Sequence, residues 1–120
     1  MAANGETNFN TAVGHSTLAA ATGGGRNVAI GNNALDADTK GGRSVAIGYD
    51  ALTAQNLTTV TTVYNVALGY GAGAAVTTGI QNTLIGALAG DVLTDADMNV
   101  AIGYAALSSD TLGSESTAIG

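Results

Sequence analysis

Short apolar runs alternate with polar and glycine-rich segments along the chain. A five-residue pattern occurs seven times: Asn or Ser, then Val or Thr, an apolar residue that is Ala in six copies, Ile, Val or Leu, and Gly. The final glycines are 17 residues apart, except for one interval of 21. Such self-similarity predicts a repeat fold, in which each unit buries its apolar face against its neighbours. These glycines, called marker glycines below, are Gly14, Gly31, Gly48, Gly69, Gly86, Gly103 and Gly120.

Each apolar run is too short for a helix and is typical of a short β-strand. The Asn or Ser before it favours a corner, because its side chain bonds to nearby backbone. The marker glycine indicates a positive φ or a close backbone approach. We therefore predict an all-β fold, a parallel β-solenoid of about seven 17-residue coils over residues 10–120, after a lead-in at 1–9. A rise of about 4.8 Å per coil gives a length of about 34 Å.

The middle residue of each run has its own orientation, because side chains alternate across a strand. If the two flanking Val, Ile or Thr residues point inward, the middle residue points outward and forms a flat stripe that suits another chain. We therefore predict a homotrimer. The alternative is that Ala faces a narrow interior and the chain is a monomer. The predicted interface residues are Ala12, Ala29, Ala46, Ala67, Leu84, Ala101 and Ala118.

Composition narrows the classes of function. The chain has 3 Lys+Arg against 9 Asp+Glu, and a net charge of −6 argues against nucleic-acid binding, which needs clustered cations. The absence of Cys excludes a disulfide scaffold and a thiolate metal site. No apolar run approaches the roughly 20 residues of a membrane span, so we expect no membrane insertion of this segment. No nucleophile, base and orienting group occur together, and we expect neither an enzyme nor a cofactor.

The Asn/Ser-Val-Ala-Ile-Gly repeat, with phrases such as NVAIGYAAL at residues 99–107, carries a family resemblance. It is similar to the head domains of trimeric autotransporter adhesins and, more closely, to the 17-residue repeats of bacteriophage tail fibres and fibre-like bacterial surface proteins. The resemblance covers residues 10–120. It implies a left-handed parallel β-roll, three chains about one axis, and an extracellular role in attachment to a host receptor or glycan. Adhesin heads usually have a shorter repeat. Because the last residue is a marker glycine, we expect a segment of a longer fibre.

Few residues are candidates for a metal site. His15 is the sole histidine, and three copies around a three-fold axis could hold a metal ion; the alternative is a plain corner residue. Asp91, Asp95 and Asp97 form an acidic cluster of the kind that calcium prefers. The glycine- and aspartate-rich nonapeptide of calcium-binding β-rolls is absent, so we assign no metal site and expect these aspartates to be solvated corners.

Three tyrosines share the position directly after a marker glycine, namely Tyr49, Tyr70 and Tyr104. Stacked rings on an exposed edge combine flat apolar area with a hydroxyl group, and could contact a sugar or a receptor. The alternative is that they pack over a corner of the coil or at a subunit interface.

The four-residue insertion lies within residues 57–64. Binding loops often grow as insertions on one face of a repeat protein. We therefore predict a specific contact over residues 56–63, with Asn56, Thr58 and Thr59 as its polar members. The alternative is that the insertion only bulges.

Two further columns recur without forming strands. One holds Thr nine residues before the marker glycine in five coils, with Val60 at this place in the insertion coil. A Thr column suggests the alternative function, a monomeric β-solenoid binding protein such as an ice-binding protein. The other column shows no residue preference, and we expect it to face solvent. The Thr column contains Thr22, Thr39, Thr77, Thr94 and Thr111, and the variable column contains Phe9, Arg26, Arg43, Tyr64, Gln81, Met98 and Glu115.

Overall fold

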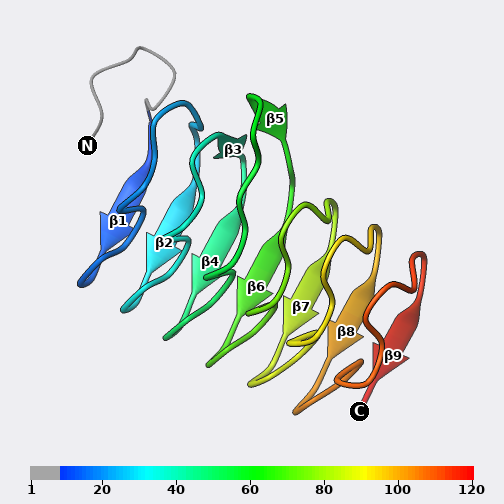
Figure 1. The fold of residues 1–120 in the computed structure, drawn as a ribbon. Helices are drawn as coiled ribbons and strands as arrows, with labels where there is room; N and C mark the ends of the chain where they lie inside the picture. The colour runs from blue at the N-terminus through cyan, green and yellow to red at the C-terminus, as the bar shows by residue number, and fades with distance from the viewer. Residues whose placement is uncertain (1–8) are drawn as a thin grey trace.

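The computed structural model describes residues 9–120, so residues 1–8 of the predicted lead-in lie outside the described part of the chain. Residues 9–120 contain short strands and turns and no helix, and they wind into a parallel β-solenoid (Figure 1). The strands are β1 (Thr11–Val13), β2 (Val28–Ile30), β3 (Gly41–Gly42), β4 (Val45–Ile47), β5 (Thr61–Thr62), β6 (Val66–Leu68), β7 (Thr83–Ile85), β8 (Val100–Ile102) and β9 (Thr117–Ile119).

The main sheet stacks one strand from every coil in the order β1-β2-β4-β6-β7-β8-β9, and every pair is parallel. Paired residues are 17 apart, as in Thr11 opposite Val28, except across the insertion, where Val45 lies opposite Val66. The predicted strands, period and all-β solenoid are therefore confirmed. A second sheet of two strands, β3 and β5, lies away from the main sheet beside the insertion (Figure 1).

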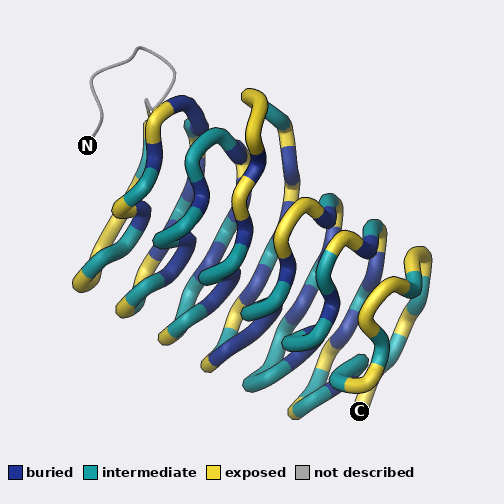
Figure 2. The backbone as a smooth tube through the Cα atoms, in the orientation of Figure 1, coloured by how far each residue is buried: buried dark blue, intermediate teal, exposed yellow. Residues whose placement is uncertain are grey.

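The orientation predicted for the middle residue of each main-sheet strand is wrong. Ala29, Ala46, Ala67 and Ala101 have no exposed surface, and Leu84 has none either. They face the interior of the coil, as the dark-blue inner positions of Figure 2 show. Ala118 packs partly buried against the same core, and Ala12 is exposed in the first coil. These residues therefore do not form an interface with another chain.

The narrowness of the coil is the physical reason. The two shorter extents of the molecule are 25 and 16 Å, and opposite the inward Ala residues lies a layer that includes Leu18, Leu35 and Leu52. Little space is left for a second row of large side chains, because protein interiors are close-packed. The sheet therefore turns its small residues inward and its β-branched residues outward.

Leu84, the one large residue in the inward column, shows how tight this packing is. A Cβ atom added to Gly73 would lie 2.8 Å from a Leu84 methyl group, and one added to Gly90 would lie 2.7 Å from the other methyl. These glycines hold the place that Leu35 and Leu52 occupy in other coils. The large residue on one wall is thus accommodated by losing two side chains from the facing wall.

The Asn that precedes each strand is buried and serves as a rung between coils. The Asn82 side-chain amide donates to the Ala96 carbonyl at 2.8 Å, and its Oδ1 accepts the backbone N–H of Asn99 at 3.0 Å. Asn82 N–H in turn donates to Asn65 Oδ1 at 2.9 Å. The predicted corner is therefore confirmed, and the side chain satisfies backbone groups on two adjacent coils that would otherwise be buried without partners.

Ser44 replaces Asn in this column, and its side chain is too short to span the coil. Gln55 fills the gap, because its Nε2 donates to Asp38 Oδ2 at 2.6 Å and its Oε1 accepts from Asn65 Nδ2 at 2.9 Å. Asp38 is almost fully buried and also accepts the Gly41 N–H at 2.9 Å. The interior next to the insertion is therefore polar and hydrogen-bonded, unlike the apolar interior of later coils.

Marker glycines stand where the coils approach most closely. At Gly14, with a φ of 133°, an added Cβ would lie 2.6 Å from the Gly31 carbonyl oxygen of the next coil. Any larger residue would push the coils apart, so the predicted requirement for close backbone approach is confirmed at this position.

Candidate functional site

The outer face of the main sheet is the largest continuous apolar surface of the solenoid. It consists of the first and third residues of each strand, and of these fourteen residues eleven are Val, Ile or Leu and three are Thr. Ile30 keeps 37% of its surface exposed, Leu68 44% and Ile102 36%. The face carries no charged residue. Single exposed apolar side chains are ordinary, but a continuous apolar face marks an interaction site.

Sequence reasoning missed this face because it assigned the alternating residues to the wrong sides. The signal was nevertheless present. Ala is the only small residue of the three, and a 17-residue coil is too thin to enclose two rows of β-branched side chains as well as the Leu layer. Residue size within the alternation could therefore have identified the exposed side.

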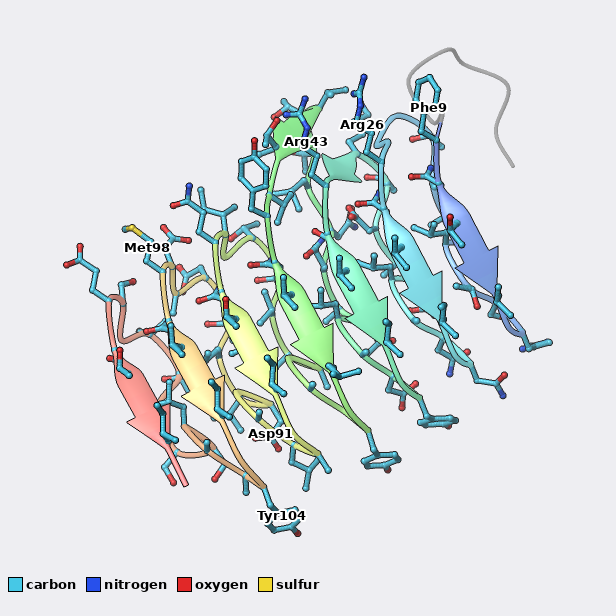
Figure 3. The ribbon with its side chains drawn as sticks, turned by 180° about the vertical axis from the view of Figure 1, so that it is seen from behind. Phe9, Arg26, Arg43, Asp91, Met98 and Tyr104 are labelled. Atoms are coloured by element: carbon cyan, nitrogen blue, oxygen red, sulfur yellow. The ribbon has the colours of Figure 1, made fainter. Side chains whose placement is uncertain are left out.

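The tyrosine column lies along one edge of the main sheet and is exposed (Figure 3). Tyr49 and Tyr70 come from adjacent coils, and their rings stack with centroids 5.6 Å apart and planes 9° apart. Tyr104 is separated from them by the coil that carries Ala87, and it is 75% exposed. The rings do not pack over a corner of their own coil, and they present aromatic faces and hydroxyl groups to solvent.

His15 belongs to the same column and is exposed in the first coil. Its Nδ1 lies 3.0 Å from the Ser16 hydroxyl, and its backbone N–H donates to Asn32 Oδ1 at 3.3 Å. These contacts are those of a corner residue. Within residues 9–120 no three His, Cys, Asp or Glu side chains come together as a possible metal site.

The three aspartates Asp91, Asp95 and Asp97 take separate roles. Asp97 Oδ1 accepts the Ile80 N–H at 2.7 Å, and Asp95 Oδ1 accepts from the Thr94 hydroxyl at 3.2 Å. Asp91 Oδ1 is buried without a hydrogen-bond partner. Their oxygens do not converge on one point, so the acidic cluster seen in the sequence is not assembled in space.

The insertion is confined to the start of its predicted range. Asn56 still pairs in register with the Thr column, because the Thr39 hydroxyl donates to Asn56 Oδ1 at 2.8 Å. Regular stacking resumes at Thr61, whose N–H donates to the Lys40 carbonyl at 3.2 Å. The added residues are thus 57–60, and Val60 is not a member of the Thr column, contrary to the sequence alignment. Of the predicted contact residues, Asn56, Thr58 and Thr59 are all exposed.

The Thr column forms a hydrogen-bonded ladder along the solenoid. The hydroxyl of Thr94 donates to the Thr111 carbonyl at 3.1 Å, and that of Thr77 donates to the Thr94 carbonyl at 3.3 Å. These hydroxyl hydrogens are engaged within the chain, and Asn56 interrupts the row. An ice-binding surface presents free, regularly spaced hydroxyl groups, so this geometry does not favour the alternative function.

The variable column is exposed at every coil, as predicted (Figure 2). Phe9, Arg26, Arg43 and Tyr64 are consecutive members. The Arg26 guanidinium carbon lies 5.4 Å from the Phe9 ring centroid, and that of Arg43 lies 5.9 Å from the Tyr64 ring centroid. Figure 3 shows Phe9, Arg26 and Arg43 gathered at one corner, on the edge opposite Tyr104. We call these four residues and Lys40 the basic corner.

Comparison of the chain with protein-family models, with curated proteins and with solved structures gives no match. The fold is therefore carried by the structure alone, and the adhesin and tail-fibre resemblance rests on the repeat residues. Within residues 9–120 the structure contains no helix long and apolar enough to cross a membrane.

Proposed function

We propose that this chain is a structural and adhesive fibre module of a phage tail fibre or a bacterial surface adhesin. In this proposal three copies pack their main-sheet faces together around one axis and form a stiff rod outside the cell. The observation that carries it is the uncharged face of Val, Ile, Leu and Thr, which continues through all seven strands of the sheet.

A second copy of the chain is the partner that this face fits best. Its two outward columns repeat once per coil, so another copy in the same orientation has the same spacing along the whole length. A partner with another period would match it only locally. The number of three copies comes from the resemblance of the repeat to trimeric fibres and adhesin heads.

The magnitudes favour assembly through the full length of the face. Fully burying a Val, Leu or Ile side chain contributes about 1.5–3 kcal/mol, so covering the exposed half contributes about 1 kcal/mol. Eleven such residues then contribute about 10 kcal/mol per chain. Association costs about 4–15 kcal/mol in lost freedom, so most coils must take part. A rod of several chains also presents each surface site several times, so that individually weak contacts add up.

Cysteine labelling tests the proposed interface, because the chain has no native Cys. Ile47→Cys places a thiol on the main-sheet face, and Thr58→Cys places one on the insertion as the matched control. We expect the thiol at position 47 to react at least about tenfold more slowly than the one at position 58. Equal rates at both positions in the native protein would show that the face is open and would overturn the proposal.

A further inference from the structure

The backbone of the variable column raises the question of why its side chains are retained. All seven residues of this column have left-handed φ values between 58° and 65°. This conformation is unfavourable for L-residues other than Gly, Asn and Asp. At other left-handed positions the chain uses such residues, for example Asn33, Asp50 and Gly71. In the variable column it uses none of them.

Packing does not explain the long side chains of this column, because every one of them is exposed. Their identities also differ from coil to coil, so they are not required for stacking. Long side chains kept at a strained and exposed backbone position, where Gly would be easier, indicate a role at the surface. The basic corner is the part of the column where the side chains also contact one another.

Charge is concentrated at this corner. The chain has three Lys and Arg residues in all, and they are Arg26, Lys40 and Arg43, which lie in two adjacent coils. The contacts of the two guanidinium groups within residues 9–120 are with the Phe9 and Tyr64 rings and with the Thr62 hydroxyl, not with a carboxylate. Cations without an acidic partner in a chain of net charge −6 are available to an anionic ligand.

The insertion builds one wall of the corner. Arg43 Nη1 donates to the Thr62 hydroxyl at 2.7 Å, which fixes the guanidinium against β5. The Lys40 side chain and Val60 both lie against Gly23 in the coil before, where an added Cβ would be 3.2 Å from Lys40 Cγ and 3.4 Å from Val60 Cγ2. The only coil longer than 17 residues therefore supplies residues beside the only cations.

We infer that the basic corner binds an acidic glycan. Carboxylate or sulfate groups of the sugar would be held by Arg26 and Arg43, and a sugar ring would lie against Phe9 or Tyr64. Guanidinium groups pair with such anions through charge-assisted hydrogen bonds, and aromatic rings provide flat apolar contact. The coil spacing of about 4.8 Å brings the two arginines within reach of one short oligosaccharide.

A nucleic acid fits this corner less well. Its phosphates form a long and regular row, and strong binding needs many cations along it. Here the cations span two coils, and six of the nine acidic residues lie at or beyond Asp50, in the later coils. A long polyanion would therefore meet repulsion over most of the molecule. The inference deepens the proposed attachment role and rests on it, although the binding site itself lies within one chain.

Calorimetric titration of the intact chain at low salt tests the inference. The probes are a heparin tetrasaccharide for sulfate, an oligogalacturonate for carboxylate, maltotetraose as the neutral sugar, and a single-stranded oligonucleotide. We expect at least one acidic sugar to bind, and to bind more tightly than maltotetraose and the oligonucleotide. Arg26→Gln and Arg43→Gln should each weaken it by about tenfold, and Tyr64→Ala by severalfold. Met98→Gln, in the same column but another coil, should leave it unchanged.

Three outcomes would overturn the inference: no binding of either acidic sugar, equal binding of the oligonucleotide, or an equal loss in the Met98→Gln variant. Light scattering on the same samples separates this inference from the proposed assembly. A mass of one chain with glycan binding intact supports the basic corner and contradicts the trimer. A mass of three chains without glycan binding contradicts the basic corner alone.

Discussion

The main-sheet face and the basic corner differ in how they use the repeat. The face has the same class of residue at every coil, and no charge. The corner has a different residue at each coil, and it holds every cation of the chain. Uniformity along the axis suits contact with another copy that has the same period, whereas variation marks one place along the axis. Repetition therefore points to assembly, and departures from it point to recognition.

The largest expected effect is the loss of assembly when one charge enters the face. Ile47→Asp places a carboxylate at the centre of the proposed interface, where burying an unpaired charge is costly. We expect the mass by light scattering to fall from three chains to one. The matched variant Met98→Asp, on the variable column, should keep the mass of three chains, and a fall in both variants would contradict the distinction between the two surfaces.

The inner side of the sheet should respond in the opposite way. Leu84→Ala removes a fully buried side chain that faces Gly73 and Gly90, and leaves a cavity. We expect a loss of about 2–5 kcal/mol in the free energy of unfolding, measured by denaturant titration. Adding Gly90→Leu restores the Ala and Leu pairing of other coils, and should recover part of this loss. No recovery in the double variant would show that the two walls are not complementary.

Two neighbouring residues separate the buried ladder from the exposed column. Asn82→Ala leaves the Ala96 carbonyl and the Asn99 N–H without partners, and should cost about 2–4 kcal/mol of stability. Gln81→Ala, one residue earlier and exposed, should change stability by less than about 0.5 kcal/mol. Thermal unfolding of both variants makes the comparison. Equal shifts would mean that the Asn side chain is not the rung between coils.

The smallest expected effect is at the tyrosine edge. Tyr49→Ala removes the stacking partner of Tyr70, and this contact is worth about 0.5–1.5 kcal/mol. Since both rings are exposed, we expect a loss near the lower end of this range, without a change in mass or in glycan affinity at the basic corner. A loss of glycan affinity would instead place the sugar site on this edge.

The sequence predicted the period, the strands, the register and the corner residues, because each depends on local chemistry that recurs at fixed spacing. It placed Ala29 and its column on the wrong side, because alternation alone does not say which side is inside. The role of Gln55 beside Ser44 was not predictable from the pattern, because this side chain compensates for a missing Asn from another part of the coil. Val60 was misplaced because an insertion shifts the register only where the coil can bulge. Three chains and a left-handed coil stay predictions.

The solution mass of the unmodified chain, measured by multi-angle light scattering, tests the central claim most directly. The account predicts three times the chain mass of 11.6 kDa, because the apolar face of the main sheet is covered by other copies. A mass of 11.6 kDa at all concentrations would contradict it, and would mean that the face is open to solvent or to a different partner.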